Sequence, residues 1–208
     1  MKRLASEIKY AFYLTFHPFK GFWDIKYEGA GSLGTAFLIL GIFTAMQIAH
    51  GLYAGYLFNP GGGVSYNVLK SIAEILLVFF AWCISNWCLT CLFDGEGSFR
   101  DILRATAYAL QPMILVWVLL IPLSHMLSQR EAAIYTFVYT LGILWTAFLL
   151  FSSTLVTHQY TMFKTVLMIL CIILGMCVLA YIALLFFNLI GQMTGFVEVL
   201  VKEIQNRS

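Results

Sequence analysis

The chain has 208 residues, of which 61% are hydrophobic and only 11% are charged, and its mean hydropathy is +0.87. A soluble domain normally carries about 25% charged residues, so this composition argues against a soluble protein and indicates an integral membrane protein. The formal net charge is only +2 and the sequence shows no basic face, which argues against nucleic-acid binding.

Residues 1–31 are predicted to form a cytoplasmic segment that contains an amphipathic helix at the membrane interface. Its apolar residues recur every three or four positions, at Leu4, Ile8, Ala11, Phe12 and Phe16. His17 should end this helix, because a residue that precedes proline is disfavoured in the helical region. The aromatic residues that follow are predicted interface anchors, namely Phe19, Phe22 and Trp23.

Residues 32–208 are predicted to form one membrane domain. Long uncharged stretches recur there, and a helix needs roughly 20 apolar residues to cross a bilayer. Lipid offers no partner to backbone polar groups, and long apolar runs without alternation exclude a barrel, so each stretch should be helical. The predicted fold is all-α, a polytopic helical bundle with five spans at about residues 33–57, 70–92, 102–126, 132–156 and 166–193.

The turn between the second and third spans is acidic and carries glycine, from Asp94 to Gly97. Ser98 with Asp101 three residues later is the pattern of a capping box, so the third helix should begin at Phe99. Pro112 predicts a kink further along this span.

The distribution of lysine and arginine predicts the orientation of the chain. One side of the membrane carries eight of these residues: Lys2, Arg3, Lys9, Lys20, Lys26, Arg100, Arg104 and Lys164. The other side carries four, namely Lys70, Arg130, Lys202 and Arg207. Because the cytoplasmic side is the more basic one, the N-terminus is predicted to be cytoplasmic and the C-terminus extracellular.

Several motifs resemble one known family. The run NWCLTCLFDGEGSFRDI from Asn86, the following AYALQP, the upstream HPFKGFWDIKYEG and the downstream THQYTMFK are similar to those of the Yip family of five-span membrane proteins, in particular its bacterial branch. Eukaryotic members interact with Rab/Ypt GTPases through a long soluble N-terminal segment, whereas only about 31 residues precede the first span here. Bacterial members often accompany sugar-importing ABC transporters, so the resemblance implies a membrane adaptor or accessory subunit of the bacterial plasma membrane.

Polar residues inside the spans suggest two further features. Asn86 and Gln111 should lie at similar depths in the second and third spans, where a hydrogen bond between them would fix the helix register. A second set is predicted in the outer half of the membrane: Gln47, His50, Glu74, Asn188 and Gln192. If these residues converge, they could form a polar pocket with a carboxylate–histidine pair. Otherwise Glu74 reaches the interface and His50 bonds a neighbouring backbone group.

The acidic turn is a candidate docking site for a partner, through Phe93, Asp94, Gly95, Glu96, Gly97, Phe99 and Arg100. It lacks the dense acidic spacing of a calcium loop, and the cysteines of the second span lie on one helix without a nearby histidine, so no metal site is predicted. No catalytic motif or cofactor-binding loop is recognisable.

These observations lead to two hypotheses. The first is a non-catalytic membrane adaptor that binds other integral membrane proteins, with subunits of a carbohydrate ABC transporter as the plausible partners. The alternative is a small-solute transporter or channel that uses the outer polar pocket. The sequence is also compatible with an oligomer.

Overall fold

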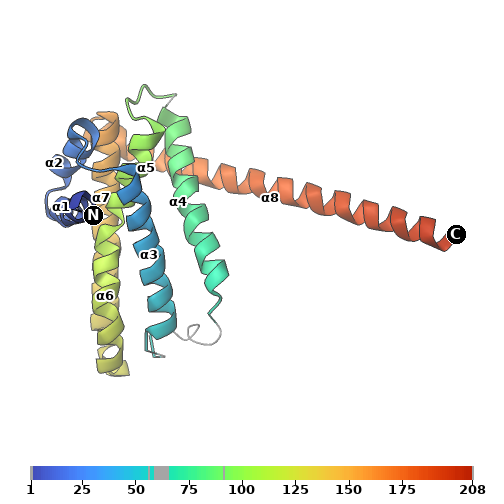
Figure 1. Ribbon diagram of the computed structural model, residues 1–208, viewed down its shortest axis with the longest axis horizontal. Coiled ribbons are helices and arrows are strands. Elements are labelled where there is room, and N and C mark those ends of the chain that lie inside the picture. Colours follow the sequence, from blue (N-terminus) through green and yellow to red (C-terminus); the bar gives the residue numbers. More distant parts are fainter. Residues whose placement is uncertain (1, 56, 59–65, 91, 208) are drawn as a thin grey trace.

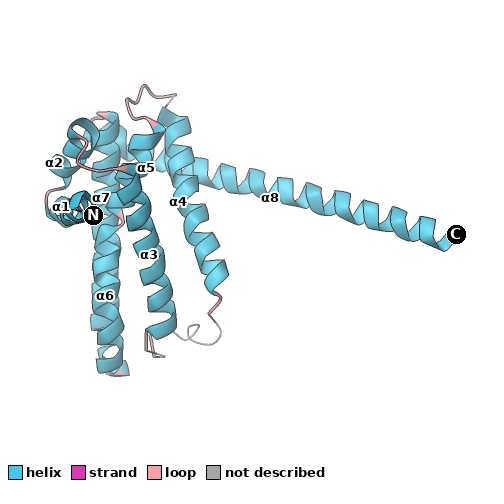
Figure 2. Cartoon of the chain, in the orientation of Figure 1, coloured by secondary structure: helices cyan, strands magenta, loops and turns pink. Residues whose placement is uncertain are grey.

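The computed structural model describes the whole chain except residues 1, 56, 59–65, 91 and 208. The described part is helical and contains no strand (Figure 2). In chain order the helices are α1 Lys2–Phe16, α2 Pro18–Trp23, the π-helical turn η1 Asp24–Glu28, α3 Leu33–Tyr53, α4 Val68–Thr90, α5 Phe99–Ala109, α6 Gln111–Met126, the 3-10 turn η3 Gln129–Glu131, α7 Ala132–His158 and α8 Met162–Arg207.

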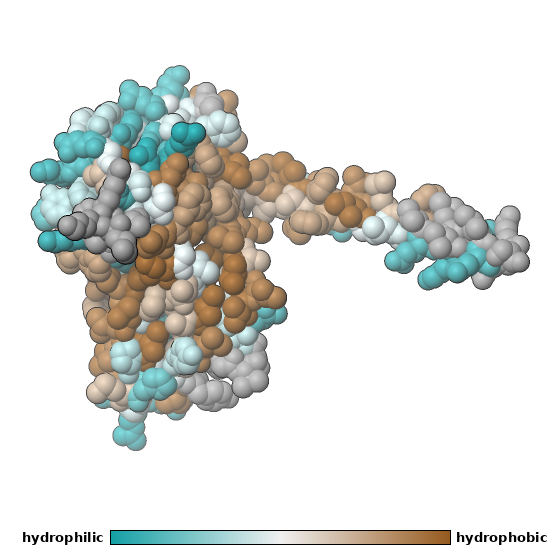
Figure 3. All heavy atoms as spheres, viewed as in Figure 1, coloured by the Kyte–Doolittle hydropathy of each residue, from teal (hydrophilic) through white to brown (hydrophobic). Residues whose placement is uncertain are grey.

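Five helical stretches of the described residues are long and apolar enough to cross a membrane, which confirms the predicted polytopic bundle. They are Leu33–Tyr53, Val68–Thr90, Phe99–Met126, Gln129–His158 and Met162–Phe196. Figure 3 shows an apolar belt between two hydrophilic ends of the bundle, as expected for a protein surrounded by lipid. Many large apolar side chains are therefore exposed on the bundle surface.

The third span consists of two helices, because the chain bends between Ala109 and Gln111. Pro112 stands in the first turn of α6, where its missing N–H removes no hydrogen bond within that helix. The predicted kink is therefore present at the predicted position. The buried residues of α5 include Ala105, Ala107 and Ala109, whose small side chains allow neighbouring helices to approach closely.

The N-terminal segment folds against the bundle instead of forming one long helix. The first helix ends at Phe16, just before the His17–Pro18 pair, as predicted. Its packing differs from the expected apolar face, because Ala11 is buried whereas Phe12 and Phe16 are exposed. Phe22, predicted as an interface anchor, is 1% exposed and belongs to the core.

The last helix leaves the bundle. Its first part packs against α4, where the Ser85 hydroxyl donates to the carbonyl of Ile172 at 2.8 Å. Gly175 makes this contact possible, because a Cβ there would lie 2.3 Å from Ser85 Oγ. The described side chains from Ala180 to Phe196 are all exposed. Figure 1 shows α8 (orange to red) projecting away from the other spans.

Candidate functional site

The hairpin turn between α4 and α5 is built by local backbone chemistry. The Ser98 hydroxyl accepts the Asp101 N–H at 3.3 Å, and the Asp101 carboxylate accepts the Ser98 N–H at 3.2 Å. This reciprocal pair is the predicted capping box, and α5 begins at Phe99 as expected. Asp94 adopts a left-handed conformation with φ of 53°, which reverses the chain after α4. The turn thus has one defined backbone path.

His158 lies beneath the turn as the last residue of α7, and its side chain is 1% exposed. Its Nε2 is 3.0 Å from the Oδ1 of Asn86, so the ring donates to the amide oxygen. Its Nδ1 is 3.4 Å from the Thr90 hydroxyl, which itself donates to the Asn86 carbonyl at 2.7 Å. These bonds connect α4 to α7 at a buried position.

The glycines of the turn pack directly on this histidine and its neighbour. A Cβ on Gly97 would lie 2.7 Å from Cε1 of His158, and a Cβ on Gly95 would lie 2.4 Å from the Tyr160 hydroxyl. Real Cβ atoms do not approach other heavy atoms this closely. Glycine is therefore required at both positions by close approach. We call Asn86, Thr90, Gly95, Gly97, His158 and Tyr160 the turn cluster.

Lysine side chains clamp the turn from two sides. The Lys164 ammonium donates to the Phe93 carbonyl at 2.8 Å and lies 4.4 Å from the centre of the Tyr160 ring. Lys26, from η1, donates to the Thr157 carbonyl at 2.8 Å and lies 3.5 Å from a carboxylate oxygen of Glu96. Three segments that are distant in sequence therefore meet at this end of the bundle.

The electrostatics of the turn act on Tyr160. Burial and, to a smaller extent, the negative charge of Asp94 raise the pKa of its phenol above the ordinary tyrosine value. The neutral phenol donates to the Phe93 carbonyl at 3.4 Å.

The predicted docking residues divide into two groups in the structure. Phe93, Asp94, Glu96 and Arg100 are exposed, whereas Gly95, Gly97 and Phe99 are buried or half-buried. Phe99 makes an edge contact with Trp87, with ring centres 6.0 Å apart. The exposed residues form the outer edge of the turn, and the others hold it in place.

The prediction that Asn86 bonds Gln111 is wrong, because Asn86 has a different partner. Both residues are buried, but the Asn86 carboxamide bonds His158, whereas Gln111 starts α6 on the far side of the helix break. Helix α7 contributes the polar group that meets Asn86. The Asn86 side chain therefore links α4 to the fourth span and not to the third.

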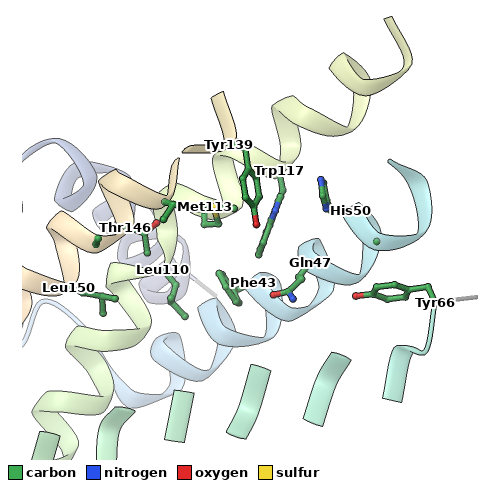
Figure 4. Close-up of a pocket in the computed structure, with 13 residues that line it drawn as sticks. Phe43, Gln47, His50, Tyr66, Leu110, Met113, Trp117, Tyr139, Thr146 and Leu150 are labelled. Atoms are coloured by element: carbon green, nitrogen blue, oxygen red, sulfur yellow. The ribbon is translucent and has the colours of Figure 1, made fainter. Parts of the chain in front are cut away.

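The outer polar residues converge only in part. Two adjoining cavities of about 430 and 330 Å³ lie between α3, α4, α5, α6 and α7, and we call them together the chamber. Figure 4 shows the larger of the two. Gln47 lines both cavities, His50 lines the larger and Glu74 lines the smaller. Asn188 and Gln192 are exposed on the projecting part of α8.

Of the two alternatives for these residues, the carboxylate–histidine pair is not formed, and Glu74 is exposed as the other alternative expected. His50 Nε2 is 2.7 Å from the Tyr135 hydroxyl, so it bonds a side chain and not the backbone. Glu74 instead lies 3.7 Å from Lys70 on the same helix, and both side chains are exposed. Within the described part of the chain, no group of three or more His, Cys, Asp or Glu residues could hold a metal ion.

The sequence reasoning missed the central role of His158. The one available signal was the position of His158 and Tyr160 at the end of a span that faces the same side as the acidic turn. Helix depth alone paired Asn86 with Gln111, which was predicted at a similar depth in the adjoining third span.

The fold and this site define a polytopic α-helical membrane protein in which a hairpin turn is seated on the end of a later span. Residues 12–192 match the family model described as the Yip1 domain. The protein therefore belongs to the Yip1-domain family. Comparison with curated proteins and with solved structures found no match.

Proposed function

We propose that this protein is a non-catalytic membrane adaptor that docks a partner membrane protein through the outer edge of the hairpin turn. The observation that supports the proposal is the division of the turn into a fixed inner side and an exposed outer edge. Asp94 and Glu96 present carboxylates, and Phe93, 41% exposed, presents an aromatic ring beside them. An acidic edge with an aromatic anchor suits a basic partner surface with an apolar pocket.

The backbone of the turn is held in one conformation, which favours a docking role over that of a loop that only contacts solvent. A flexible loop loses conformational entropy when it binds, whereas a loop held in one conformation loses much less. Here the capping box, the two lysines and the close glycine contacts hold the backbone before any partner arrives. Glu96 is 65% exposed although it lies near Lys26, so its carboxylate remains accessible.

The partner that we propose is a permease subunit of a carbohydrate ABC transporter in a bacterial plasma membrane. This choice rests on the resemblance to the bacterial Yip branch, and the lysine and arginine distribution supports an N-terminus in the cytoplasm and an extracellular C-terminus. In that orientation the turn faces the cytoplasm. It would then meet the cytoplasmic loops of the permease.

The proposal is tested by co-purification in mild detergent and by photo-crosslinking from position 96 in native membranes. Permease subunits should be captured, and the pair of changes Asp94→Asn and Glu96→Gln should reduce capture about five-fold, because each exposed charge contributes up to about 1 kcal/mol. Glu198→Gln, which removes an exposed carboxylate on α8, is the matched control and should leave capture unchanged. Recovery of the protein alone after crosslinking would reject the adaptor function.

The alternative function, small-solute transport, draws on Gln47 and His50 in the chamber. The separation of Asn188 and Gln192 from these residues, and the Glu74–Lys70 pair, favour the adaptor. Transport would require that Glu74→Gln combined with His50→Ala abolishes solute flux in proteoliposomes. Unchanged flux would remove the chamber as a transport site.

A further inference from the structure

Polar groups in the chamber lack hydrogen-bond partners. The Gln47 carboxamide and the hydroxyls of Tyr66 and Tyr139 all line the larger cavity, and they make no hydrogen bond with any described residue. Figure 4 shows both hydroxyls directed toward the space beside Gln47. Gln47 and Tyr139 lie within candidate spans, and Tyr66 lies just before α4. A polar group that faces a mostly apolar cavity is costly to leave unpaired, so such groups are normally paired with protein, water or a ligand.

The rest of the chamber is apolar. Phe43, Leu110 and Leu150 line both cavities, and the smaller cavity adds Ile75 and Phe79. Cavities with walls of this kind stay dry and take up apolar molecules. Water alone would satisfy the polar groups but would not cover these walls. The occupant that suits both parts has a hydrogen-bonding group and a hydrocarbon part.

The two kinds of lining are unevenly distributed along the chamber. Both tyrosine hydroxyls and His50 face the larger cavity, whereas the smaller one is lined mostly by aliphatic and aromatic side chains. Its polar groups are Gln47, which lines both cavities, Glu74, Thr106 and the buried indole N–H of Trp82, which has no hydrogen-bond partner among the described residues. The smaller cavity also reaches Val78, which is 56% exposed on the lipid-facing surface of α4. A molecule from the surrounding bilayer can therefore enter between α3 and α4.

The charge of the lining restricts the polar group of the occupant. Among the described residues, no Asp, Glu, Lys or Arg lines the larger cavity, and Glu74, at the smaller one, is exposed and near Lys70. A charged head would lose its hydration without gaining an ion pair. The volumes of about 430 and 330 Å³ are those of small-molecule sites, and an α-helix, about 10 Å across with its side chains, is too wide for them.

We propose that the chamber binds an uncharged, single-chain lipid from the bilayer. A hydroxyl, ester or amide head would bond Gln47 and the tyrosine hydroxyls in the larger cavity. The hydrocarbon chain would lie along Phe43, Leu110 and Phe79 toward the lipid-facing opening. This binding is separate from docking at the turn.

The probe for this site is a long-chain fatty alcohol that carries a diazirine at mid-chain. The full-length protein is reconstituted in phosphatidylcholine liposomes, illuminated with the probe, and the labelled peptides are mapped by mass spectrometry. Labelling should concentrate on α3, α4 and α7 residues of the chamber, and excess unlabelled alcohol should suppress it. Labelling that is spread over all exposed apolar residues, α8 included, and is not suppressed would overturn the proposal.

Two variants and a control test whether the lipid occupies the chamber and whether its head group contacts Gln47. Leu150→Trp fills the chamber and should lower labelling about ten-fold or more. Leu144→Trp, on the same helix but 62% exposed and outside the chamber, should leave it unchanged. Gln47→Leu keeps the volume but removes the head contact, and should weaken labelling about five-fold.

The variants remain informative if the tryptophan disturbs folding, because Gln47→Leu keeps the size of the side chain, and size-exclusion profiles report the state of each protein. Equal labelling of the wild type and a folded Leu150→Trp variant would overturn the site. Loss in Leu150→Trp with no change in Gln47→Leu would also overturn it, since a plain hydrocarbon would then be the occupant.

Discussion

The turn cluster and the chamber both place polar side chains among the spans, but they satisfy them differently. In the turn cluster, His158 bonds Asn86 and approaches Thr90 within a buried network. In the chamber, Gln47 and Tyr139 have no such partner among the described residues. A satisfied buried network fixes how helices pack, whereas an unsatisfied one leaves binding capacity for another molecule. The same bundle thus contains a polar site that stabilises helix packing, the turn cluster, and a polar site that is proposed to bind a ligand, the chamber.

The largest effect on stability is expected from His158→Ala in the turn cluster. This change removes the partner of buried Asn86 and opens a cavity, so we expect a loss of about 3 kcal/mol in the free energy of unfolding. Denaturant titration in detergent micelles, followed by tryptophan fluorescence, measures the loss. His125→Ala is the control, because His125 is exposed and bonds only the Tyr53 carbonyl. A loss as large in the control would contradict a special role for the turn cluster.

The next effect is expected from Gly97→Ala. The added methyl would overlap His158 Cε1 and Thr157 Cγ2, so the turn must shift away from α7, at a cost of about 2 kcal/mol. The same titration measures it. In the control Gly191→Ala the methyl has no atom within 4 Å, and the change should be neutral or slightly stabilising. Equal stability of both variants would mean that the turn is not seated on α7.

Ser98→Ala tests the local support of the turn. It removes the hydroxyl that accepts the Asp101 N–H, and loss of a helix cap costs about 1 kcal/mol. The matched control is Ser128→Ala at the opposite end of the bundle, where an equivalent capping box closes only the short η3 turn. Thermal unfolding should show the larger decrease for Ser98→Ala. The reverse order would argue that the hairpin turn does not depend on its cap.

A pair of identical substitutions sharpens the contrast between the two regions. Thr90→Val removes a hydroxyl that donates to the Asn86 carbonyl, and should destabilise the protein by about 1 kcal/mol. Thr146 lines the chamber, and its buried hydroxyl has no partner, so Thr146→Val should be neutral or stabilising. Unfolding of lipid-free protein compares them. A clear loss for Thr146→Val would reveal a partner and weaken the distinction.

The smallest effect concerns pH and comes from Tyr160. Because its pKa is raised in the folded protein, the unfolded chain releases the phenol proton first, near pH 10. The stabilisation is complete below that pH and is lost as the pH rises through the raised folded value. Tyr160→Phe should therefore reduce the alkaline decline in stability, measured by unfolding at a series of pH values. An unchanged decline would mean that ionisation of the Tyr160 phenol does not contribute to the loss of stability at alkaline pH.

Local chemistry was predictable from the sequence where neighbouring residues determine it. Hydropathy located five spans within a few residues, because the cost of unpaired backbone groups in lipid depends on composition over one helix length. The Ser98 capping box, the end of α1 before Pro18 and the break at Pro112 also follow from adjacent residues.

Contacts between distant segments could not be predicted in the same way. The bond between Asn86 and His158 joins residues 72 positions apart and depends on the rotation of α4 against α7. Likewise the sequence left open whether the polar residues of α8 converge with those of α3, because the direction of α8 depends on its packing near Ser85. A hydropathy profile indicates how deep a residue lies in the membrane. It does not indicate how a helix is rotated about its axis or in which direction the helix runs.

The bond between Trp145 and the N-terminal segment affects the lipid around the protein. The Trp145 indole donates to the carbonyl of Thr15, near the end of α1, at 3.1 Å. Trp145 is midway along α7, about 20 Å from His158 at 1.5 Å per residue, so the end of α1 contacts the bundle beside the middle of α7 (Figure 1). Farther along, Lys26 meets Thr157, so this segment follows one half of α7. The N-terminal segment therefore covers part of the candidate span Gln129–His158 that lipid would otherwise contact.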